Sequence, residues 1–441
     1  MRRGQGQRAF ARLGAAAIIA ATMLGAAGTA AAAIIAVAST FDADTEGWQQ
    51  QTRGPGPAIG SSSAVNWVST GGDPGGFVRL TAPSEGVWSY WRAPAAFRGD
   101  RRAYGEGFLT FSLRSNQTLV HDFSINSPGT GHDVEIDSGA GQVYYDIPGP
   151  DLAANVWHRF SLPLDGAGWR FSAGNAAVSP AQFETVLSQV NDLRIRAEWS
   201  TAVDTDDLDS VGLTAPAFAL SQATTSGEVG SSHCVGADLD STSPSGVLIR
   251  FATSGATSTS GTETADADGR ATYCYDGPLA SGTDTITAYP DFDGDATQDV
   301  NEPSEQLSFS WTAPLASDGC KLTLGGVVTT VDGAQLSFGG NFRIRNALPL
   351  GSFSALELTD TGEREFVVAS VSTLSCDAEA GTAVALGTVS VDGGAAQPFR
   401  LDILDAGEPG SADTFRLRVT GALDTGTQTL SGGNVQLHKA K

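Results

Sequence analysis

The residues with the clearest capacity for chemistry are five carboxylates in the twelve-residue run DFDGDATQDVNE. They occupy positions 1, 3, 5, 9 and 12 of that run and are Asp291, Asp293, Asp295, Asp299 and Glu302. Carboxylates at these positions supply the ligands of an EF-hand calcium loop, whose sixth residue is glycine. Here the sixth residue is Ala296, and the flanking sequence is typical of strands. The run predicts either a calcium-binding loop between two strands or an acidic loop screened by solvent.

Four cysteines form a second group, arranged as two short-range pairs. Cys234 is paired with Cys274 and Cys320 with Cys376, and residues 1–233 contain no cysteine. An even number of cysteines beside an export signal indicates disulfides in an oxidising compartment. Bridging a loop of about 40 residues restricts the unfolded chain by roughly 4 kcal/mol on the loop-entropy model. The alternatives are buried free thiols and a zinc site, and the lack of any C-x-x-C spacing disfavours zinc.

Aromatic residues form the third group. Seven of the eight tryptophans lie in residues 39–215, and Trp88, Tyr90 and Trp91 are clustered. Aromatic rings stack on the apolar faces of sugars while polar neighbours bind the hydroxyls. On a strand, Trp88 and Tyr90 share one face and Trp91 takes the other. The cluster is a candidate carbohydrate-binding platform, and core packing is the alternative role for these rings.

The sequence carries no recognisable catalytic motif. There is no nucleophile elbow, no His-Glu-x-x-His and no phosphate-binding glycine loop. We therefore predict that the protein is not an enzyme, although scattered carboxylate pairs leave a glycoside-acting enzyme as an alternative. The net charge of −23 repels nucleic acid and anionic lipid, so neither is an expected partner.

Residues 1–38 have the features of a signal peptide. Four arginines precede an uncharged, alanine-rich stretch from Leu13 to Ala38, and small residues at 36–38 or 30–33 suit a signal peptidase. Cleavage yields a secreted or cell-surface protein with no membrane span in the mature chain. An uncleaved segment is long enough to remain as an anchor.

The rest of the chain has sequence patterns that are typical of β-strands. Runs such as 77–80, 109–113, 193–196 and 415–419 alternate apolar and polar residues, as half-buried strands do. Residues 179–190 are the exception, because a Ser-Pro cap signal precedes apolar residues at helical spacing. We predict an all-β chain of three consecutive antiparallel β-sandwich domains: residues 39–215, 216–315 and 316–441.

Residues 39–215 resemble the laminin B (laminin IV type A) domain. The matching motifs are Gly47-Trp48, Pro74-Gly75-Gly76, Trp88-Ser89-Tyr90-Trp91-Arg92-Ala93-Pro94, Phe183-Glu184-Thr185-Val186-Leu187, Ile195-Arg196-Ala197-Glu198-Trp199 and Leu208-Asp209-Ser210-Val211. The resemblance implies a jelly-roll sandwich of the galactose-binding type, a fold used largely for extracellular recognition.

The other two segments also resemble known modules. His233-Cys234-Val235, Gly282-Thr283-Asp284 and Asn301-Glu302-Pro303-Ser304 are similar to motifs of bacterial Ig-like (invasin/Big-1 type) domains. Phe338-Gly339-Gly340-Asn341-Phe342 and the run 402–415 resemble the post-COAP-1 domain of secreted bacterial proteins. These resemblances imply an Ig-like spacer and a C-terminal β-sandwich without known chemistry.

Taken together, the sequence predicts a secreted or cell-surface recognition or adhesion protein. Its first domain would bind carbohydrate or another extracellular surface ligand, and structural calcium is the one predicted cofactor. The alternative is a structural protein of a matrix or cell surface, in which the domains act as spacers.

Overall fold

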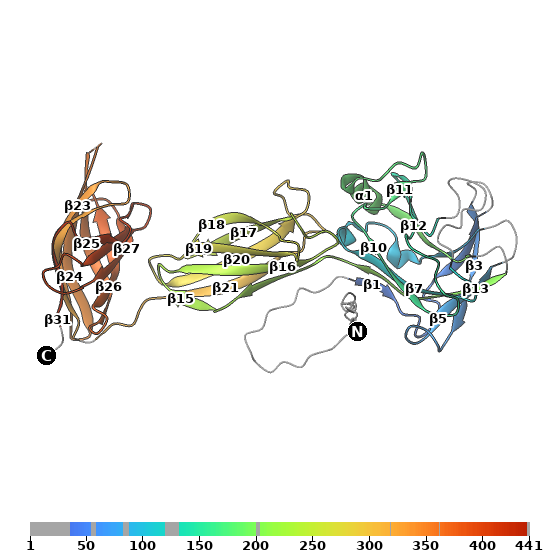
Figure 1. Ribbon diagram of the computed structural model, residues 1–441, viewed down its shortest axis with the longest axis horizontal. Helices are drawn as coiled ribbons and strands as arrows, with labels where there is room; N and C mark the ends of the chain where they lie inside the picture. Colours follow the sequence, from blue (N-terminus) through green and yellow to red (C-terminus); the bar gives the residue numbers. More distant parts are fainter. Residues whose placement is uncertain are drawn as a thin grey trace, which may run out of the picture.

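A computed structural model describes residues 36–53, 59–82, 88–119, 132–199, 203–317, 319–360 and 362–438. Within these ranges the chain is mostly β-strand, with one α-helix, α1 (Pro180–Leu187), and two short 3-10 helices, η1 (Ala95–Phe97) and η2 (Arg102–Tyr104). Three β modules follow one another along an elongated molecule (Figure 1). We refer to residues 36–214, 217–312 and 320–438 as the first, middle and last modules. The predicted all-β, multi-sandwich architecture is confirmed.

The first module is a sandwich of two antiparallel sheets. The six-stranded sheet contains β10 (His158–Pro163), β7 (Phe108–Ser115), β13 (Asp204–Thr214), β5 (Phe77–Ala82) and β4 (Asn66–Val68) in that order, with β1 (Ala36–Ser39) paired to β13. The seven-stranded sheet has the order β11 (Arg170–Phe171), β9 (Gly141–Tyr145), β8 (Val134–Ser138), β12 (Val190–Arg196), β6 (Trp88–Arg92), β2 (Gln49–Arg53) and β3 (Ile59–Ala64). Alternate residues of both sheets fill one shared core, which includes Trp48, Trp91, Trp169 and Trp199.

The predicted helix is present and is shorter than its apolar spacing indicated. Ser179 caps it in a reciprocal capping box with Gln182, which satisfies two otherwise unpaired backbone N–H groups. Phe183, Val186 and Leu187 bury the inner face. The prediction extended to Val190, but that residue begins β12.

Most of the predicted signal peptide, residues 1–38, lies outside the described residues. Its last three residues belong to strand β1. Residues 36–39 pair with residues 214–211 of β13, and Ser39 accepts a hydrogen bond from the Trp48 indole at 2.9 Å. Cleavage after Ala38 would remove most of this strand, whereas cleavage within residues 30–33 would leave it whole. The described strand therefore overlaps the last three residues of the predicted signal peptide.

The middle module packs a three-stranded sheet against a five-stranded sheet. The smaller sheet has the order β14 (Ala217–Gln222), β16 (Ser232–Asp240), β19 (Arg270–Asp276), and the larger has β15 (Ser226–Glu228), β21 (Glu305–Thr312), β20 (Gly282–Asp291), β17 (Leu248–Gly255), β18 (Thr259–Thr264). Asp284 is fully buried and accepts hydrogen bonds from Trp311 at 2.6 Å and Tyr275 at 3.2 Å. This carboxylate joins strands of the two sheets through their aromatic side chains.

The last module is a single ten-stranded antiparallel sheet whose inward side chains share one core. Its order is β29 (Leu423–Asp424), β28 (Thr414–Val419), β27 (Ala396–Leu404), β26 (Thr382–Val391), β25 (Gly362–Asp377), β24 (Leu348–Thr359), β23 (Gln335–Arg345), β22 (Lys321–Thr329) and β31 (Gly432–His438), with β30 (Gln428–Thr429) paired to β28. In β28, Phe415, Leu417 and Val419 are buried while Arg416 and Arg418 face outward, as the alternation predicted.

Both predicted disulfides are present. Cys234 and Cys274 are directly opposite one another on β16 and β19, on the exposed side of the smaller middle sheet. Cys320 and Cys376 join the start of β22 to the end of β25, and Cys320 lies in the core of the last module. The first bridge therefore links neighbouring strands of one sheet, and the second is partly buried.

The junction between the first and middle modules is built around Glu106. Its carbonyl oxygen accepts a hydrogen bond from the Thr242 backbone at 3.0 Å, and its carboxylate accepts one from the Thr242 hydroxyl at 3.3 Å. Ser243 donates to Asp165 of the first module. Burial raises the pKa of Glu106 to about 7, and the charge of Asp165 adds to the effect.

We expect this junction to weaken as the pH rises from 5 to 8. Because the pKa of Glu106 in the folded protein lies above its ordinary value of 4.5, the protonated folded form is favoured. The contribution of protonated Glu106 to the free energy of unfolding is fully present below the pKa of this group in the unfolded chain. It is lost as the pH rises through about 7, the pKa of the group in the folded protein. In EDTA, the melting temperature should differ less between pH 5 and pH 8 for Glu106→Gln than for the parent. Glu379→Gln, at an exposed position, is the control. If it reduces the pH dependence of the melting temperature as much as Glu106→Gln does, the effect comes from net charge and not from the junction.

The middle and last modules are joined by two arginines whose side chains are only 12% and 13% exposed. Arg400 of β27 donates to the Glu228 carboxylate at 2.6 Å and to the carbonyl oxygen of Val229, and Arg418 donates to the carbonyl oxygen of Gly230. Leu386 of β26 lies in the core cluster of the middle module. The outward face of the last module is therefore a docking surface for the end of the middle module.

Candidate functional site

The first module has one sheet face that is polar and yet largely buried. Trp91 of β6 and Ile195 of β12 are paired and lie in the core, so their neighbours Tyr90 and Arg194 point away from it. The side chains on this outward side combine guanidinium, carboxylate, amide and aromatic groups. We call them the polar face: Trp88, Tyr90, Arg92, Glu135, Asp137, Gln142, Tyr144, Asp192, Arg194 and Arg196.

Strand register places several of these residues in one row across the sheet. Tyr144 lies opposite Glu135, which in turn lies opposite Arg194. The row continues from Arg194 to Arg92 of β6 and then to Gln49 of β2. Opposed side chains on a sheet are roughly 5 Å apart. Hydrogen-bonding groups are therefore repeated at short, regular intervals across five strands.

Arg194 is the centre of this row. Its side chain is 2% exposed, and its guanidinium donates to Gln51 at 2.6 Å and to Asp192 at 3.1 Å. The fully buried carboxylate of Glu135 lies 3.4 Å away and also accepts a hydrogen bond from the Tyr90 hydroxyl at 3.3 Å. Each planar group in this network is held by its neighbours, so the face is rigid before any ligand arrives.

A second buried ion pair lies at the edge of the face. Arg196 and Asp133 are both 1% exposed and lie 2.9 Å apart, with the Arg196 guanidinium 4.0 Å from the centre of the Trp199 ring. Burial raises the pKa of Asp133 to about 6, against the lowering effect of the Arg196 charge. His132 stacks on Tyr144 with ring centres 3.3 Å apart. Charged and aromatic groups are therefore interleaved at this edge of the face.

The three predicted ligand-binding residues are placed on both sides of the sheet. Trp88 and Tyr90 belong to the polar face, while Trp91 is fully buried in the core. Trp88 is 9% exposed and Tyr90 is fully buried. The accessible parts of the face are at its rim, where the side chain of Arg92 is 23% exposed and that of Asp137 is 37% exposed.

Sequence reasoning did not identify the buried charges of this face. Arg194 and Arg196 were treated as the solvent side of a half-buried strand, and Glu135 was not selected. One signal was available, since arginine on alternate residues of a strand that also carries Leu193 and Ile195 puts both charges on the same face. Its partners lie far away in the sequence, so the signal alone could not show that the charges are paired.

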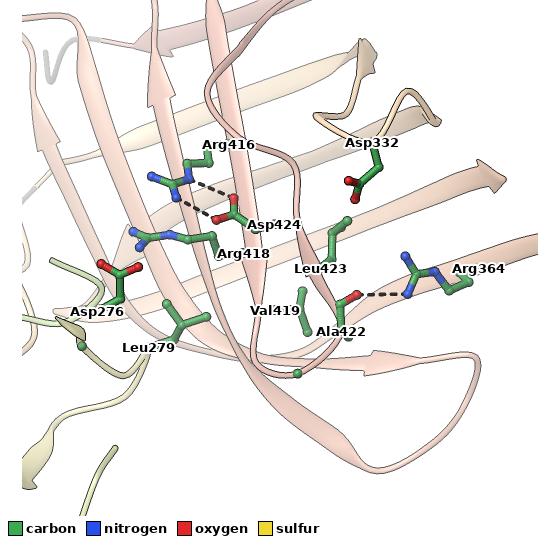
Figure 2. A pocket seen from close by; sticks show the side chains of 12 residues that line it. Asp276, Leu279, Asp332, Arg364, Arg416, Arg418, Val419, Ala422, Leu423 and Asp424 are labelled. Atoms are coloured by element: carbon green, nitrogen blue, oxygen red, sulfur yellow. Dashed lines mark hydrogen bonds and ion pairs between the residues drawn. The ribbon is translucent and has the colours of Figure 1, made fainter. Parts of the chain in front are cut away.

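A hollow lies at the junction of the middle and last modules. It is a cleft of about 480 Å³ lined by Asp276 and Leu279 on one side and by Arg364, Arg416 and Arg418 on the other (Figure 2). Three arginines in a strongly acidic protein could attract an anion.

Each of these arginines already has a partner within the protein. Arg416 forms a two-bond pair with Asp424, and Arg364 donates to the carbonyl oxygen of Ala422 (Figure 2). Arg418 is paired with Asp402 of β27 at 3.2 Å. Arg364 also pairs with the carboxylate of Glu357 at 2.5 Å. The cleft is therefore part of the interdomain contact, and its positive charge is balanced internally.

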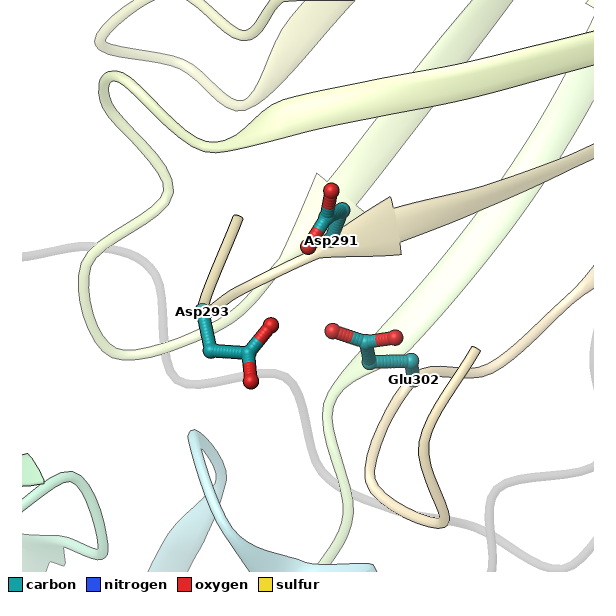
Figure 3. A group of neighbouring side chains, drawn as sticks. All are labelled: Asp291, Asp293 and Glu302. Atoms are coloured by element: carbon teal, nitrogen blue, oxygen red, sulfur yellow. The ribbon is translucent and has the colours of Figure 1, made fainter. Parts of the chain in front are cut away.

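The acidic loop of the middle module follows β20. Ligand oxygens of Asp291, Asp293 and Glu302 lie within 4.8 Å of one another, and so do those of Asp293, Asp295 and Asp299. Asp293 and Glu302 point their carboxylates towards each other (Figure 3). The fold thus gathers all the predicted calcium ligands, with Asp293 common to both groups.

The loop is also organised by its own hydrogen bonds. Asp291 is paired with Arg250 at 2.6 Å and accepts the Gly294 backbone N–H at 2.7 Å, while Glu302 accepts the backbone N–H groups of Phe292 and Asp299. Ala296, which occupies the glycine position of an EF-hand, has a positive φ of 65°. Calcium binding here remains a prediction, because backbone donors and Arg250 already satisfy two of the carboxylates.

If the loop binds calcium, the ion should protect it from hydrogen exchange. We expect calcium to slow amide exchange in residues 291–302 of the parent and to have no such effect in Asp293→Ala, because this substitution removes a ligand from both groups. Asp268→Ala removes an exposed carboxylate elsewhere in the same module and should behave like the parent. Equal exchange with calcium and with EDTA in the parent would show that the loop is only solvated.

Comparisons with known proteins give two matches, both to laminin. The laminin B (domain IV) family matches residues 90–228, from β6 to β15. The solved L4b domain of human laminin alpha-2 aligns with 40% of this chain and 96% of its own length, at 13% identity and a TM-score of 0.32. No curated protein matches this chain. The family match places a module of the extracellular-matrix type over most of the polar face.

Among the residues that the structure describes, none of the helices has the length and apolar character that a bilayer span requires.

Proposed function

We propose that this chain is a secreted, non-catalytic recognition protein that binds a carbohydrate through the polar face of its first module. The observation that carries the proposal is the row of planar polar side chains from Tyr144 to Gln49. These groups belong to a sheet surface outside the hydrophobic core and are fixed by mutual hydrogen bonds.

Carbohydrate suits this face for two physical reasons. Sugar hydroxyls both donate and accept hydrogen bonds, so they can pair with the guanidinium of Arg92 and the carboxylate of Asp137 at the same time. A rigid polar surface also binds a flexible polar ligand at a lower entropic cost than a mobile one. Trp88 and Tyr144 lie beside these groups but are only 9% and 6% exposed, so the sugar would mainly contact the charged rim.

Location and charge support an extracellular role. The two disulfides are compatible with an oxidising compartment, and the laminin B match is to a family of extracellular modules. The net charge of −23 disfavours nucleic acid as a partner, because phosphate groups would be repelled.

The test is binding of the full chain to a glycan array and to soluble polysaccharides. Arg92→Ala and Asp137→Ala should weaken binding to the best glycan by roughly 10-fold or more, since a lost hydrogen bond to a charged group is worth about 1.5–3 kcal/mol. Arg159→Ala is the matched control, because Arg159 is 56% exposed on the other sheet. Trp91→Ala is unsuitable as a binding test, since it would open a cavity in the core.

Two outcomes would overturn the proposal. The first is that the parent binds no glycan on the array, and the second is that Arg159→Ala reduces binding as much as Arg92→Ala does. Turnover of chromogenic glycosides by the parent would instead indicate an enzyme.

A structural role is the second candidate, and the module junctions favour it. Contacts such as Arg400 with Glu228, and Thr242 with Glu106, connect each module to the next. If the middle and last modules act as an Ig-like and a post-COAP-1-like spacer, the chain should behave as a stiff rod in small-angle scattering. Self-association without glycan binding would favour this matrix role over recognition.

A further inference from the structure

Cationic and apolar side chains are grouped on the outward face of β22, β23 and β24 in the last module. Lys321 of β22 lies opposite Arg343 of β23, which in turn lies opposite Leu350 of β24. Arg345 lies opposite Leu348, two residues further along the same hairpin. Opposed residues share a face of the sheet, and so do residues two apart on a strand. We call these five residues the cationic tip.

The cationic tip is exposed and its charges are not compensated. All five residues are exposed, and Leu348 and Leu350 remain 64% and 44% accessible. In the part of the chain that the structure describes, the three cations of the tip form no ion pair. The other arginines of this module are each paired with a carboxylate: Arg364, Arg400, Arg416 and Arg418. Exposed leucines beside uncompensated positive charge indicate an interaction surface.

The cationic tip faces away from the rest of the molecule. The rings of Phe338 of β23 and Phe415 of β28 stack 4.0 Å apart across the core, so the outward sides of these two strands are opposite surfaces of the module. The outward side of β28 carries Arg418, which contacts Gly230 of the middle module. The tip therefore belongs to the far surface, at the end of the elongated molecule where β24 and β31 lie (Figure 1).

The protein itself offers a surface of the opposite charge. Its net charge is −23, and residues 216–315 contain only two basic residues against fourteen acidic ones. The acidic loop of the middle module, residues 291–302, exposes Asp293, Asp295 and Asp299. Val300 of this loop is 58% exposed. An exposed apolar side chain among carboxylates is complementary to the leucines and cations of the tip.

The acidic loop of the same chain is out of reach of the tip. The last module docks on the end of the middle module that contains Glu228 and Gly230. The loop lies at the other end, beside the first module, where a Cβ atom added to Gly105 would be 3.4 Å from the side-chain nitrogen of Asn301. Strand β20 begins three residues after Leu279, which lines the cleft with the last module, and its ten residues separate the two ends by roughly 30 Å. A contact between tip and loop therefore requires two copies of the chain.

We propose that the cationic tip docks on the acidic loop of a second copy of this chain. The contact joins two different surfaces, so each copy can use its tip on one neighbour and offer its loop to another. Contacts of this kind extend into open chains unless the rotation between copies closes a ring. Both surfaces are small, so each contact is weak and depends on ionic strength. The association uses no residue of the polar face and is independent of glycan binding.

The test is sedimentation velocity of the full chain in EDTA, which keeps divalent cations from the loop carboxylates. The sedimentation coefficient of the parent should rise with protein concentration at about 0.01 M salt. It should stay constant at about 1 M salt, because the Debye length falls from about 30 Å to about 3 Å. Arg343→Glu combined with Arg345→Glu should lower the association constant by about 10-fold or more, since like charges then meet at the contact. Arg159→Glu combined with Arg170→Glu makes the same change in net charge at exposed positions of the first module and should have a much smaller effect.

A charge exchange identifies the loop as the second surface. Asp295→Lys combined with Asp299→Lys should not associate with itself, because its loop presents cations to the cationic tip. Mixing this variant with the variant that carries Arg343→Glu and Arg345→Glu should restore association, since the acidic tip of one then meets the basic loop of the other. Recovery in the mixture also shows that both variants are folded.

Three results would overturn the proposal: a monomeric parent at about 0.01 M salt, an equal loss in the control variant, or no recovery in the mixture. A monomeric parent that binds an acidic polysaccharide through Arg343 and Arg345 would assign the tip to a polyanion instead. Arg92→Ala, on the polar face, should associate as the parent does. This variant separates failure of the proposed self-association from failure of glycan binding.

Discussion

Replacing Arg194 with alanine should lower the unfolding free energy of the first module by about 3–5 kcal/mol, the usual loss when one partner of a buried ion pair is removed. The substitution leaves Glu135, which is fully buried, and Asp192 without their shared guanidinium. It also removes the 2.6 Å hydrogen bond to Gln51. Urea denaturation followed by tryptophan fluorescence measures this loss in the first module.

Two further variants show whether the loss comes from the unpaired charge. Arg159→Ala removes an arginine whose side chain is 56% exposed, so it should cost less than about 1 kcal/mol. Arg194→Leu combined with Glu135→Leu removes both buried charges and should be less destabilising than the two single substitutions added together. A loss below about 1 kcal/mol in Arg194→Ala would show that the network does not stabilise the module.

Removing either disulfide should have an effect of similar size. Cysteines 234 and 274 are separated by 40 residues, and cysteines 320 and 376 by 56. Loop closure in the unfolded chain accounts for about 4 kcal/mol in each case. We expect the double serine variant of each pair to destabilise its own module by about that amount. The effect should be larger in the last module, where Cys320 also packs in the core.

The two bridges should differ in their response to reductant. Cys234 and Cys274 are exposed, so a mild thiol should reduce them in the folded protein. Cys320 is only 4% exposed, and its bridge should persist until the last module unfolds. Mass spectrometry after alkylation counts the free thiols at each stage. Simultaneous reduction of both bridges under native conditions would contradict this difference in accessibility.

Local sequence patterns were sufficient to predict much of the fold. Alternation with a period of two predicted β5, β7 and β28 together with their inward faces, because successive side chains of a strand point to opposite sides whatever surrounds them. The Ser179 cap predicted where α1 begins, since capping depends on the adjacent three residues. Cysteine spacing predicted both bridges. Each of these features depends on neighbouring residues or on a covalent bond between few candidates.

The candidate sites depended on contacts between distant parts of the chain. Alternation showed that Arg194 and Ile195 face opposite ways, but it did not show that the arginine side would be buried. That burial arises because Gln51, 143 residues away in the sequence, meets Arg194 across two strands. The clustering of aromatic residues predicted a platform of Trp88, Tyr90 and Trp91, and alternation separated Trp91 from the other two. Only the packing showed that the side of Trp91 is the core.

The acidic residues also differ in how far the sequence alone identified them. In the sequence, the acidic run at 291–302 is conspicuous, whereas Asp204 and Asp206 look like part of an ordinary solvated strand, although both are buried. The amino-acid order determined the strands, their alternating faces and the disulfides, because short-range sterics and covalent chemistry govern those. Tertiary structure decided which charges are taken out of water, because burial is set by the opposite sheet. Asp206 is 1% exposed for that reason, and the chemistry of a carboxylate depends on that environment more than on its position in the chain.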